Sequence, residues 1–285
     1  MNRNRLWQIT LFLMMAFFTF SSLAGDYKIR KIEGAKEAFA ADILQLILSK
    51  VDPAARLVPD TESMSEARLT DAVIDGQVDI IWAGTSQALE KQLLTVRIPI
   101  LKGLLGHRIF IIRKADKERF KNVTELKDLF DFKAGQGTFW GDTAVLKNAN
   151  IPTTTTIKYP NLFPMLEGGR FDYFPRAVHE PWVEVESRPE LDLIVEEHVL
   201  LIYPYAMYFF VNPSNQILHD KLYRGFEISI SDGSFDALFF ANSMIKEALS
   251  KADLAKRNII RIDNPYMHKD TPTNRSEFWL DVSKL

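Results

Sequence analysis

The sequence predicts an α/β protein of two lobes, each an open and mainly parallel sheet covered by helices. Three observations support this fold class. Strand and helix patterns alternate from residue 27 onward, a second alternating block runs from about residue 113 to 203, and an apolar strand at 205–211 precedes a mainly helical C-terminal portion. A chain of 285 residues is long enough for two domains, or for one domain in two lobes.

The first block is defined by apolar periodicity and by residues that end helices. Apolar side chains recur at helical spacing in residues 35–51, and Pro53 ends that helix. A continuous apolar run follows Gly76, as expected of a buried parallel strand. The predicted elements are strands at residues 27–32, 55–59 and 78–83 and helices at residues 35–51 and 65–75.

The second block and the C-terminal portion follow the same patterns, with Thr124 as a suitable helix cap. The tail from residue 264 to 285 is rich in Pro and Thr and is expected to wrap the surface. Predicted strands cover residues 107–113, 133–137, 153–159, 171–174 and 205–211, and predicted helices cover residues 124–129, 142–148, 162–167, 180–186, 216–231 and 234–249.

The first 24 residues have the pattern of a cleavable secretory signal peptide. Two arginines precede an apolar run at residues 11–20, and residues 22–24 give a small-x-small cleavage pattern. The alternative is a membrane anchor, but the run is short for a span of roughly 20 residues and no basic cluster follows it. We expect cleavage after Ala24 and a mature chain that is soluble outside the cytoplasm.

Composition excludes several classes of function. The chain has no cysteine, which excludes disulfides, thiol catalysis, cysteine metal sites and attachment of a lipid to a cysteine. The formal net charge of −2 lacks the basic surplus of a nucleic-acid-binding protein. We therefore expect no metal, no cofactor and no nucleic-acid partner.

Four stretches of the chain resemble one known family. They are residues 69–81, residues 123–129 together with 134–138, residues 166–173, and the returning strand 207–211 with Asn212-Pro213 after it. In this order and spacing they are similar to the periplasmic solute-binding proteins of ABC transporters, of the amino-acid-binding type (family 3-like, type II fold). The resemblance spans nearly the whole mature chain.

The resemblance implies a two-lobed periplasmic-binding-protein fold with two hinge crossings, near residues 108–113 and 205–211. A ligand would bind between the lobes at the carboxyl ends of parallel strands, and the lobes would close by hinge motion. The implied division is a signal peptide at 1–24, the first part of lobe 1 at 25–110, lobe 2 at 111–205, and a helical return to lobe 1 with the C-terminal tail at 206–285.

Candidate ligand-binding residues of lobe 1 follow the strand at 78–83. In the family the loop at this place contacts the ligand, so the resemblance implies roles for Trp82, Thr85 and Ser86. Trp82 offers a ring face and the two hydroxyl residues offer polar groups, while Gly84 allows close approach of a backbone. An ordinary turn between a strand and a helix is the alternative interpretation.

A second candidate group lies at the start of a lobe 2 helix. Gln136, Thr138 and Trp140 fall between a predicted strand and a predicted helix, and the free amides of a helix N-terminus suit an anion. The alternative is a helix cap followed by a packed tryptophan. We predict ligand contacts from all three residues.

Charged candidates come from the ends of two further strands. Arg176 and Glu180 follow the strand at 171–174 and would grip a polar ligand, although a structural ion pair would have the same sequence. Arg108 begins a crossing strand and is another candidate, or else a salt-bridge partner within the protein. His179 alone is weak evidence of a ligand contact.

The sequence departs from the amino-acid-binding pattern at two places. The family carries an arginine shortly after the first-lobe loop and an aspartate after the third similar stretch. This chain has Lys91, a point charge rather than a bidentate fork, and Ala177, with Glu180 one helical turn further on. The hypothesis is that the ligand is not a standard α-amino acid, or is held differently; whether Lys91 or Glu180 substitutes for the missing residues stays open.

The expected function is that of a monomeric periplasmic protein that captures a small polar solute for an inner-membrane ABC permease or a sensor protein. Two alternatives remain open: a ligand-free adaptor or sensory module of the same fold, and a dehydratase-like enzyme that would depend on Glu180 with His179. No Ser-His-Asp arrangement, His-x-x-x-His pattern or Gly-x-x-x-x-Gly-Lys loop is present, so we expect no enzymatic activity.

Overall fold

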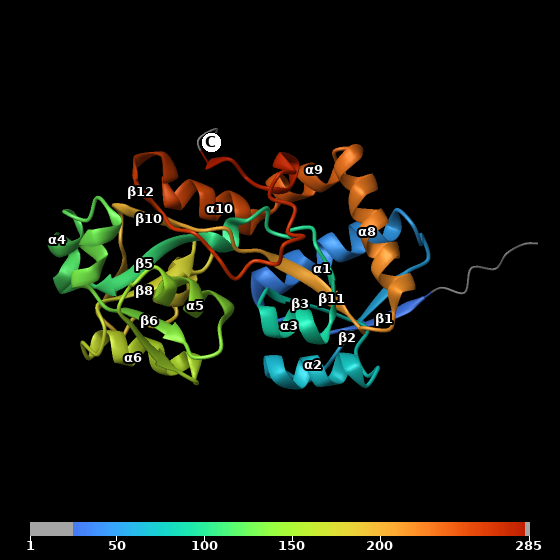
Figure 1. Ribbon diagram of the computed structural model, residues 1–285, viewed down its shortest axis with the longest axis horizontal. Coiled ribbons are helices and arrows are strands. Elements are labelled where there is room, and N and C mark those ends of the chain that lie inside the picture. Colours follow the sequence, from blue (N-terminus) through green and yellow to red (C-terminus); the bar gives the residue numbers. More distant parts are fainter. Residues whose placement is uncertain (1–24, 283–285) are drawn as a thin grey trace, which may run out of the picture.

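The computed structural model describes residues 25–282, which form two lobes that lie side by side, each with its own sheet (Figure 1). This agrees with the predicted two-lobed α/β class. The predicted signal peptide lies outside the described residues. Among the residues that the structure describes, no helix has the length and apolar character needed to cross a membrane.

Lobe 1 is built on a sheet of five strands. The strands are β1 (Asp26–Ile29), β2 (Arg56–Pro59), β3 (Ile80–Gly84), β4 (Leu94–Val96) and β11 (Met207–Val211). Their order is β2-β1-β3-β11-β4. The first three run parallel, as the strand–helix alternation predicts, whereas β11 returns from the far part of the chain and pairs antiparallel with both neighbours.

Six helices of the described chain lie before β5 or after β11, the segments that contain the strands of lobe 1. They are α1 (Gly34–Ser49), α2 (Glu66–Ile74), α3 (Gln87–Gln92), α8 (Gln216–Ser231), α9 (Ser234–Ala241) and α10 (Ser243–Ala252). α1 and α8 approach so closely that a Cβ at Gly225 would overlap the carbonyl oxygen of Ile47. Asn215 caps α8 by accepting a hydrogen bond from the backbone N–H of Leu218 at 3.1 Å.

Lobe 2 is built on a seven-stranded sheet. Its strands are β5 (His107–Arg113), β6 (Ala134–Gly137), β7 (Thr153–Thr156), β8 (Tyr173–Ala177), β9 (Leu193–Val195), β10 (Val199–Ile202) and β12 (Asn258–Arg261). The main order is β12-β10-β5-β8-β6-β7, and β9 pairs with β5. Its helices are α4 (Lys117–Phe120), α5 (Gly141–Asn148), α6 (Leu162–Glu167) and α7 (Pro181–Glu186).

The crossings between the lobes set the position of the site. The chain leaves lobe 1 after β4, enters lobe 2 at β5, and returns through residues 203–206 between β10 and β11. These connections bring the carboxyl ends of β3, β6 and β8 to the side where the lobes meet. The loops after those strands lead into α3, α5 and α7, so the helix starts of the two lobes face each other.

The C-terminal part differs from the expected helical return. β12 pairs parallel with β10 in the sheet of lobe 2, so the chain crosses to lobe 2 again after α10. It then comes back, and the backbone N–H of Leu280 donates to the carbonyl of Lys102 at 2.8 Å. The sequence signal for β12 is weak because it is an edge strand of which only Ile260 is buried.

Candidate functional site

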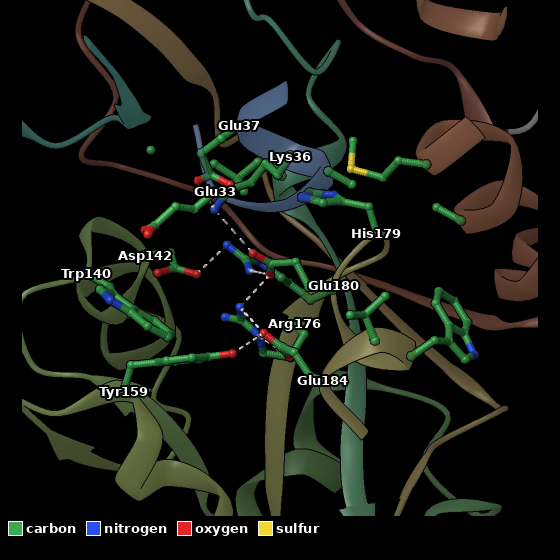
Figure 2. A pocket seen from close by; sticks show the side chains of 18 of the residues that line it. Glu33, Lys36, Glu37, Trp140, Asp142, Tyr159, Arg176, His179, Glu180 and Glu184 are labelled. Atoms are coloured by element: carbon green, nitrogen blue, oxygen red, sulfur yellow. Dashed lines mark hydrogen bonds and ion pairs between the residues drawn. The ribbon is translucent and has the colours of Figure 1, made fainter. Parts of the chain in front are cut away.

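A cavity of about 860 Å³ lies between the two lobes (Figure 2). Lobe 1 contributes the start of α1, the start of α2 and the end of β3, and lobe 2 contributes the start of α5, the end of β8 and α7. The N-terminal half of α10 closes another part of the wall. Cavities of this size between lobes are typical sites for small molecules.

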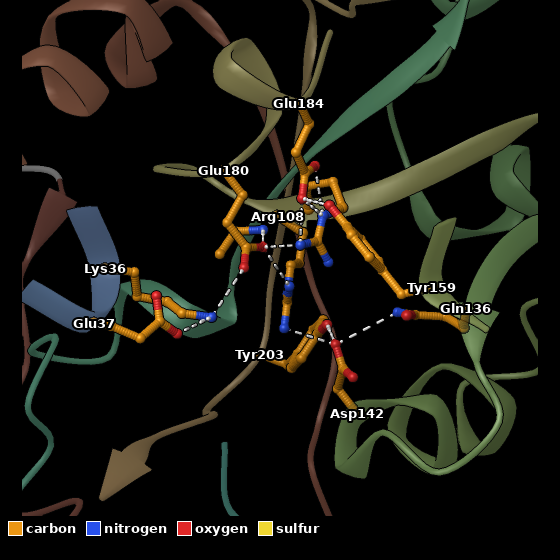
Figure 3. A network of polar contacts seen from close by, with 11 residues as sticks. Lys36, Glu37, Arg108, Gln136, Asp142, Tyr159, Glu180, Glu184 and Tyr203 are labelled. Atoms are coloured by element: carbon orange, nitrogen blue, oxygen red, sulfur yellow. Dashed lines mark hydrogen bonds and ion pairs between the residues drawn. The ribbon is translucent and has the colours of Figure 1, made fainter. Parts of the chain in front are cut away.

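The floor of the cavity holds a buried arginine. Arg108, at the start of β5, lies 2.7 Å from the carboxylate of Asp142 in the first turn of α5 (Figure 3). The Asp142 carboxylate also accepts a hydrogen bond from the hydroxyl of Tyr203 at 2.8 Å. Burial alone would lower the pKa of Arg108, but Asp142, Tyr203 and Glu180 together more than offset this effect, and the pKa lies above its ordinary value. Arg108 is therefore a charged and already paired group.

A second arginine is paired just as closely. Arg176 of β8 donates from both Nε and an Nη atom to the carboxylate of Glu184 on α7, at 2.8 and 2.6 Å. The hydroxyl of Tyr159 donates to the same carboxylate at 2.6 Å. The guanidinium lies over the rings of Trp140 and Phe174, at 5.2 and 4.8 Å from their centroids. A bidentate, stacked arginine of this kind is held rigidly.

Glu180 connects these groups to the other lobe. Its carboxylate lies 3.0 Å from Arg176 and 3.7 Å from Arg108, and it accepts a hydrogen bond from the backbone N–H of Ala177. Lys36, on α1 of lobe 1, lies 4.0 Å from it. Burial alone would raise the pKa of Glu180, but the surrounding cations, Arg176 first, lower it to about 2. The carboxylate is therefore ionised at neutral pH.

His179 is a residue of the cavity wall whose ring nitrogens have no hydrogen-bond partner among the described residues. The residue is 8% exposed, and both ring nitrogens are buried. Burial lowers the pKa of His179 to about 4, so the ring is neutral at pH 7. A buried ring with two unsatisfied nitrogens suits a hydrogen bond with a molecule in the cavity.

The buried histidines make the stability of the protein depend on pH. Burial also lowers the pKa of His107 to about 4, against 6.5 for an exposed histidine. The unfolded chain then binds more protons than the native protein, so the free energy of unfolding falls as the pH drops from about 6.5 towards 4. Between about pH 7 and about pH 4.5 we expect a loss of roughly 2–3 kcal/mol for each histidine, measured by urea unfolding.

Single substitutions separate the two contributions. His179→Gln removes one titrating group and should reduce the loss on acidification by roughly half. His268→Gln, at a position whose side chain is 37% exposed, should leave the loss unchanged. An equal loss in wild type and His179→Gln would contradict the assignment to His179.

The two lobes touch beside the cavity. α5 begins at Gly141, and a Cβ at this position would clash with the carbonyl oxygen of Thr85 in lobe 1. The same Cβ would lie 3.0 Å from the hydroxyl of Tyr205 and 3.3 Å from the Cβ of Ser86. The start of α5 therefore rests on the loop after β3, so the two lobes are in direct contact beside the cavity.

The structure brings four of the predicted site residues to the cavity and leaves five away from it. Arg108, Trp140, Arg176 and Glu180 line the cavity. Trp82, Thr85, Ser86, Gln136 and Thr138 do not line it.

The side chains of the lobe 1 candidates pack against or hydrogen-bond with other residues of lobe 1. The Trp82 ring is 1% exposed and packs edge-on against Phe209, because the alternation of β3 turns this side chain into the core. The hydroxyl of Thr85 donates to the carboxylate of Glu90. The hydroxyl of Ser86 caps α3 by accepting from the backbone N–H of Leu89 at 3.1 Å.

Two lobe 2 candidates also lie elsewhere. Gln136 is fully buried and its amide donates to Asp142 at 3.4 Å. Thr138 is exposed, and its backbone N–H donates to the carbonyl of Thr156. Asp142 already supplies negative charge to the N-terminus of α5, where the sequence suggested an anion would bind.

The structure also places the residues at which the chain departs from the amino-acid-binding pattern. Lys91 is exposed on α3 and does not line the cavity. The side chain of its neighbour Glu90 is 4% exposed and lies 2.6 Å from Arg97, so that arginine is engaged as well. Glu180 does line the cavity, but in contact with two arginines.

Several cavity residues were not among the sequence-based candidates. Lys36 and Glu37 begin α1 just after β1, Asp142 lies in the first turn after β6, and Tyr205 lies in a crossing connection. The rule that ligands bind beyond the carboxyl ends of strands applies to the first three. Because these three residues follow the ends of predicted strands, their positions in the sequence are a signal for the site. The residues that α10 contributes to the cavity have no such signal in the sequence.

The fold and the cavity define a class of two-lobed α/β proteins that enclose a small-molecule site between the lobes. No protein-family model matches the sequence, and no curated protein matches it. Among solved structures, an ancestral arginine-binding protein bound to arginine aligns over 77% of this chain and 98% of its own, with 15% identity and a TM-score of 0.55.

Two further structures extend this likeness. The amino-acid ABC transporter substrate-binding protein AbpA of Streptococcus pneumoniae, bound to L-arginine, covers 80% of this chain and 96% of its own at 15% identity, with a TM-score of 0.52. An ancestral amino-acid-binding protein, a precursor of cyclohexadienyl dehydratase, covers 76% and 95% at 14% identity, with a TM-score of 0.51. The chain therefore has the two-lobed fold of periplasmic binding proteins, as the resemblance of its sequence implied.

Proposed function

We propose that the protein is an exported solute-binding protein that holds a small polar molecule between its lobes in the periplasm. The cavity of about 860 Å³, to which both lobes contribute side chains, carries this proposal. A molecule that contacts both lobes stabilises the closed arrangement over an open one. A monomer in this closed state would present the ligand to an inner-membrane ABC permease or to a sensor protein.

The ligand is held differently from an α-amino acid in the related binding proteins. The arginines of the cavity floor are paired with carboxylates, and Lys91 lies outside the cavity. The Thr85 hydroxyl, which would contact a ligand in the family, donates instead to Glu90. These contacts support the hypothesis that the solute is not a standard α-amino acid.

The chemistry of the cavity favours binding over turnover. A dehydratase-like reaction needs a general acid that is protonated near neutral pH. Glu180 is the carboxyl group beside His179, and its pKa of about 2, lowered mainly by Arg176 against the effect of burial, keeps it ionised. We therefore infer that the cleft holds its molecule without converting it.

A thermal-shift screen with metabolites of different charge classes tests this function. A ligand at about 100 times its dissociation constant adds about 2.7 kcal/mol of stability, so we expect one class of compound to raise the melting temperature by about 5 °C or more. Mass spectrometry of small molecules released from protein purified from the periplasm identifies a natural ligand independently. If no compound raises the melting temperature and nothing is released, the ligand-free adaptor becomes the better description.

A further inference from the structure

The charged side chains of the cavity are mainly acidic. Four cationic residues line the cavity: Arg30, Lys36, Arg108 and Arg176. Seven carboxylate residues also line it: Glu33, Glu37, Glu66, Asp142, Glu180, Glu184 and Glu247. Lys31 and Lys251, which lie outside the lining, pair with Glu33 and Glu247 at 2.9 and 2.6 Å. Seven carboxylates then stand against six cations, and this small excess of negative charge favours a positively charged ligand over an anion.

Each of the four cationic side chains forms ion pairs or hydrogen bonds with other residues of the protein. Arg108 and Arg176 lie 2.7 and 2.6 Å from carboxylate oxygens of Asp142 and Glu184. The Lys36 ammonium lies between Glu37 and Glu180, at 3.6 and 4.0 Å (Figure 3). Arg30 donates to the carbonyl of Trp82 at 3.1 Å. At Arg108 or Arg176 a ligand carboxylate would have to displace a buried pair and leave a protein carboxylate without its cation.

Two lobe 1 carboxylates are the best placed for a cation. Glu37 has a side chain that is 13% exposed, and its neighbouring cation, Lys36, is shared with Glu180. Desolvation at the cavity wall raises the pKa of Glu66, and the charge of Arg30 offsets this only in part. A carboxylate whose pKa is raised by desolvation gains stability when a cation binds next to it.

An independent observation also points to a ligand. His179 lines the cavity, is 8% exposed, and has no hydrogen-bond partner on either ring nitrogen. It precedes Glu180 in the chain, and both side chains lie in the cavity wall (Figure 2). Because the ring is neutral at pH 7, it offers a hydrogen bond without adding positive charge.

We propose that the cavity binds a cation that carries no carboxylate. Glu37 and Glu66 bind its amine or guanidine group, and a ring nitrogen of His179 accepts a hydrogen bond from it. This inference rests on the proposed solute-binding function and names the chemical class of its ligand. It separates this protein from a binder of basic amino acids, in which both charges of the ligand need partners.

Matched pairs of compounds test the inference directly. Agmatine and arginine share a guanidine group, and cadaverine and lysine share an amine, but only the amino acids carry a carboxylate. Calorimetric titration of the mature protein should show binding of agmatine or cadaverine, with the matching amino acid weaker by roughly tenfold or more because its carboxylate meets like charges. Succinate and glucose, as anionic and neutral probes, should not bind.

Variants locate the site. Glu66→Gln and Glu37→Gln should each weaken binding of the cationic probe by roughly tenfold, because each removes one of the carboxylates that face it. Glu62→Gln, on the exposed segment before α2 and outside the cavity wall, should leave the affinity unchanged.

The outcomes distinguish this inference from the function on which it rests. If arginine or lysine binds at least as tightly as its decarboxylated partner, the ligand class is not restricted to cations without a carboxylate. If only succinate or glucose binds, the ligand is not a cation. In both cases the proposed solute-binding function is retained. If the molecule released from the native protein is a cation without a carboxylate, it supports the inference. If the released molecule is anionic or neutral, or carries a carboxylate, it contradicts the inference. If no probe binds and nothing is released, the proposed function fails and the ligand class fails with it.

Discussion

Replacing Arg108 with methionine is expected to lower the free energy of unfolding by about 3–5 kcal/mol. The side chains of Arg108 and Asp142 are 4% and 2% exposed and lie 2.7 Å apart, and Glu180 lies 3.7 Å from the same guanidinium. The substitution keeps most of the apolar volume but leaves buried carboxylates without their cation. Urea unfolding at pH 7 measures the loss.

Two controls give this prediction its specificity. Arg56→Met removes the cation of an exposed pair with Asp26, whose side chains are 71% and 50% exposed, and should change stability by less than about 1 kcal/mol. The double variant Arg108→Met with Asp142→Asn removes the uncompensated charge and should be more stable than Arg108→Met alone. A loss no larger than that of Arg56→Met would show that the buried network does not depend on Arg108.

Gly141→Ala is expected to open the lobes and weaken ligand binding by roughly tenfold or more. The added Cβ would clash with the Thr85 carbonyl of the opposite lobe and would lie 3.0 Å from the Tyr205 hydroxyl. Rotation of the lobes about the crossings relieves this contact without disturbing either core. Small-angle scattering should show a larger radius of gyration, and calorimetry with the ligand from the thermal screen should show the lower affinity.

A matched substitution tests whether the effect depends on the interface. Gly168→Ala adds the same methyl group after α6, where the nearest atom to the new Cβ is the carbonyl oxygen of Pro164 in the same helix, at 3.2 Å. It should leave the radius of gyration and the affinity unchanged. If the radius of gyration of Gly141→Ala is unaltered, α5 shifts within lobe 2 to accommodate the methyl group. The contact between α5 and the Thr85 carbonyl would then not limit closure of the lobes.

Much of the fold could be predicted because its signals are local. The alternation of apolar strands and helices predicted the parallel part of each sheet, and the apolar run at 205–211 predicted the strand that rejoins lobe 1. β12 was missed because its exposed side chains give no apolar pattern, and its place depends on pairing with β10, which lies almost sixty residues earlier. Edge strands of this kind are specified by their partner rather than by their own sequence.

The candidate site was predictable only in part, for a related reason. Arg108, Arg176 and Glu180 could be placed at the cavity because each lies at the end of a strand that borders the lobe junction. Trp82 and Thr85 lie on an equally plausible strand end, yet packing turns one into the core and a neighbouring carboxylate engages the other. Which side chain at a strand end faces a cavity depends on residues distant in sequence.

The sequence by itself determined the α/β class and the absence of thiol chemistry, since periodicity and composition are properties of consecutive residues, and its resemblance to a known family implied the two-lobed arrangement. Only the tertiary structure decided the charge of the site. Arg108 and Arg176, which the sequence suggested as contacts for a polar ligand, are paired in the structure with Asp142 and Glu184, which lie 34 and 8 residues away from them. Because a buried charge must be compensated, each arginine is held by a protein carboxylate and is not left free for an anionic ligand.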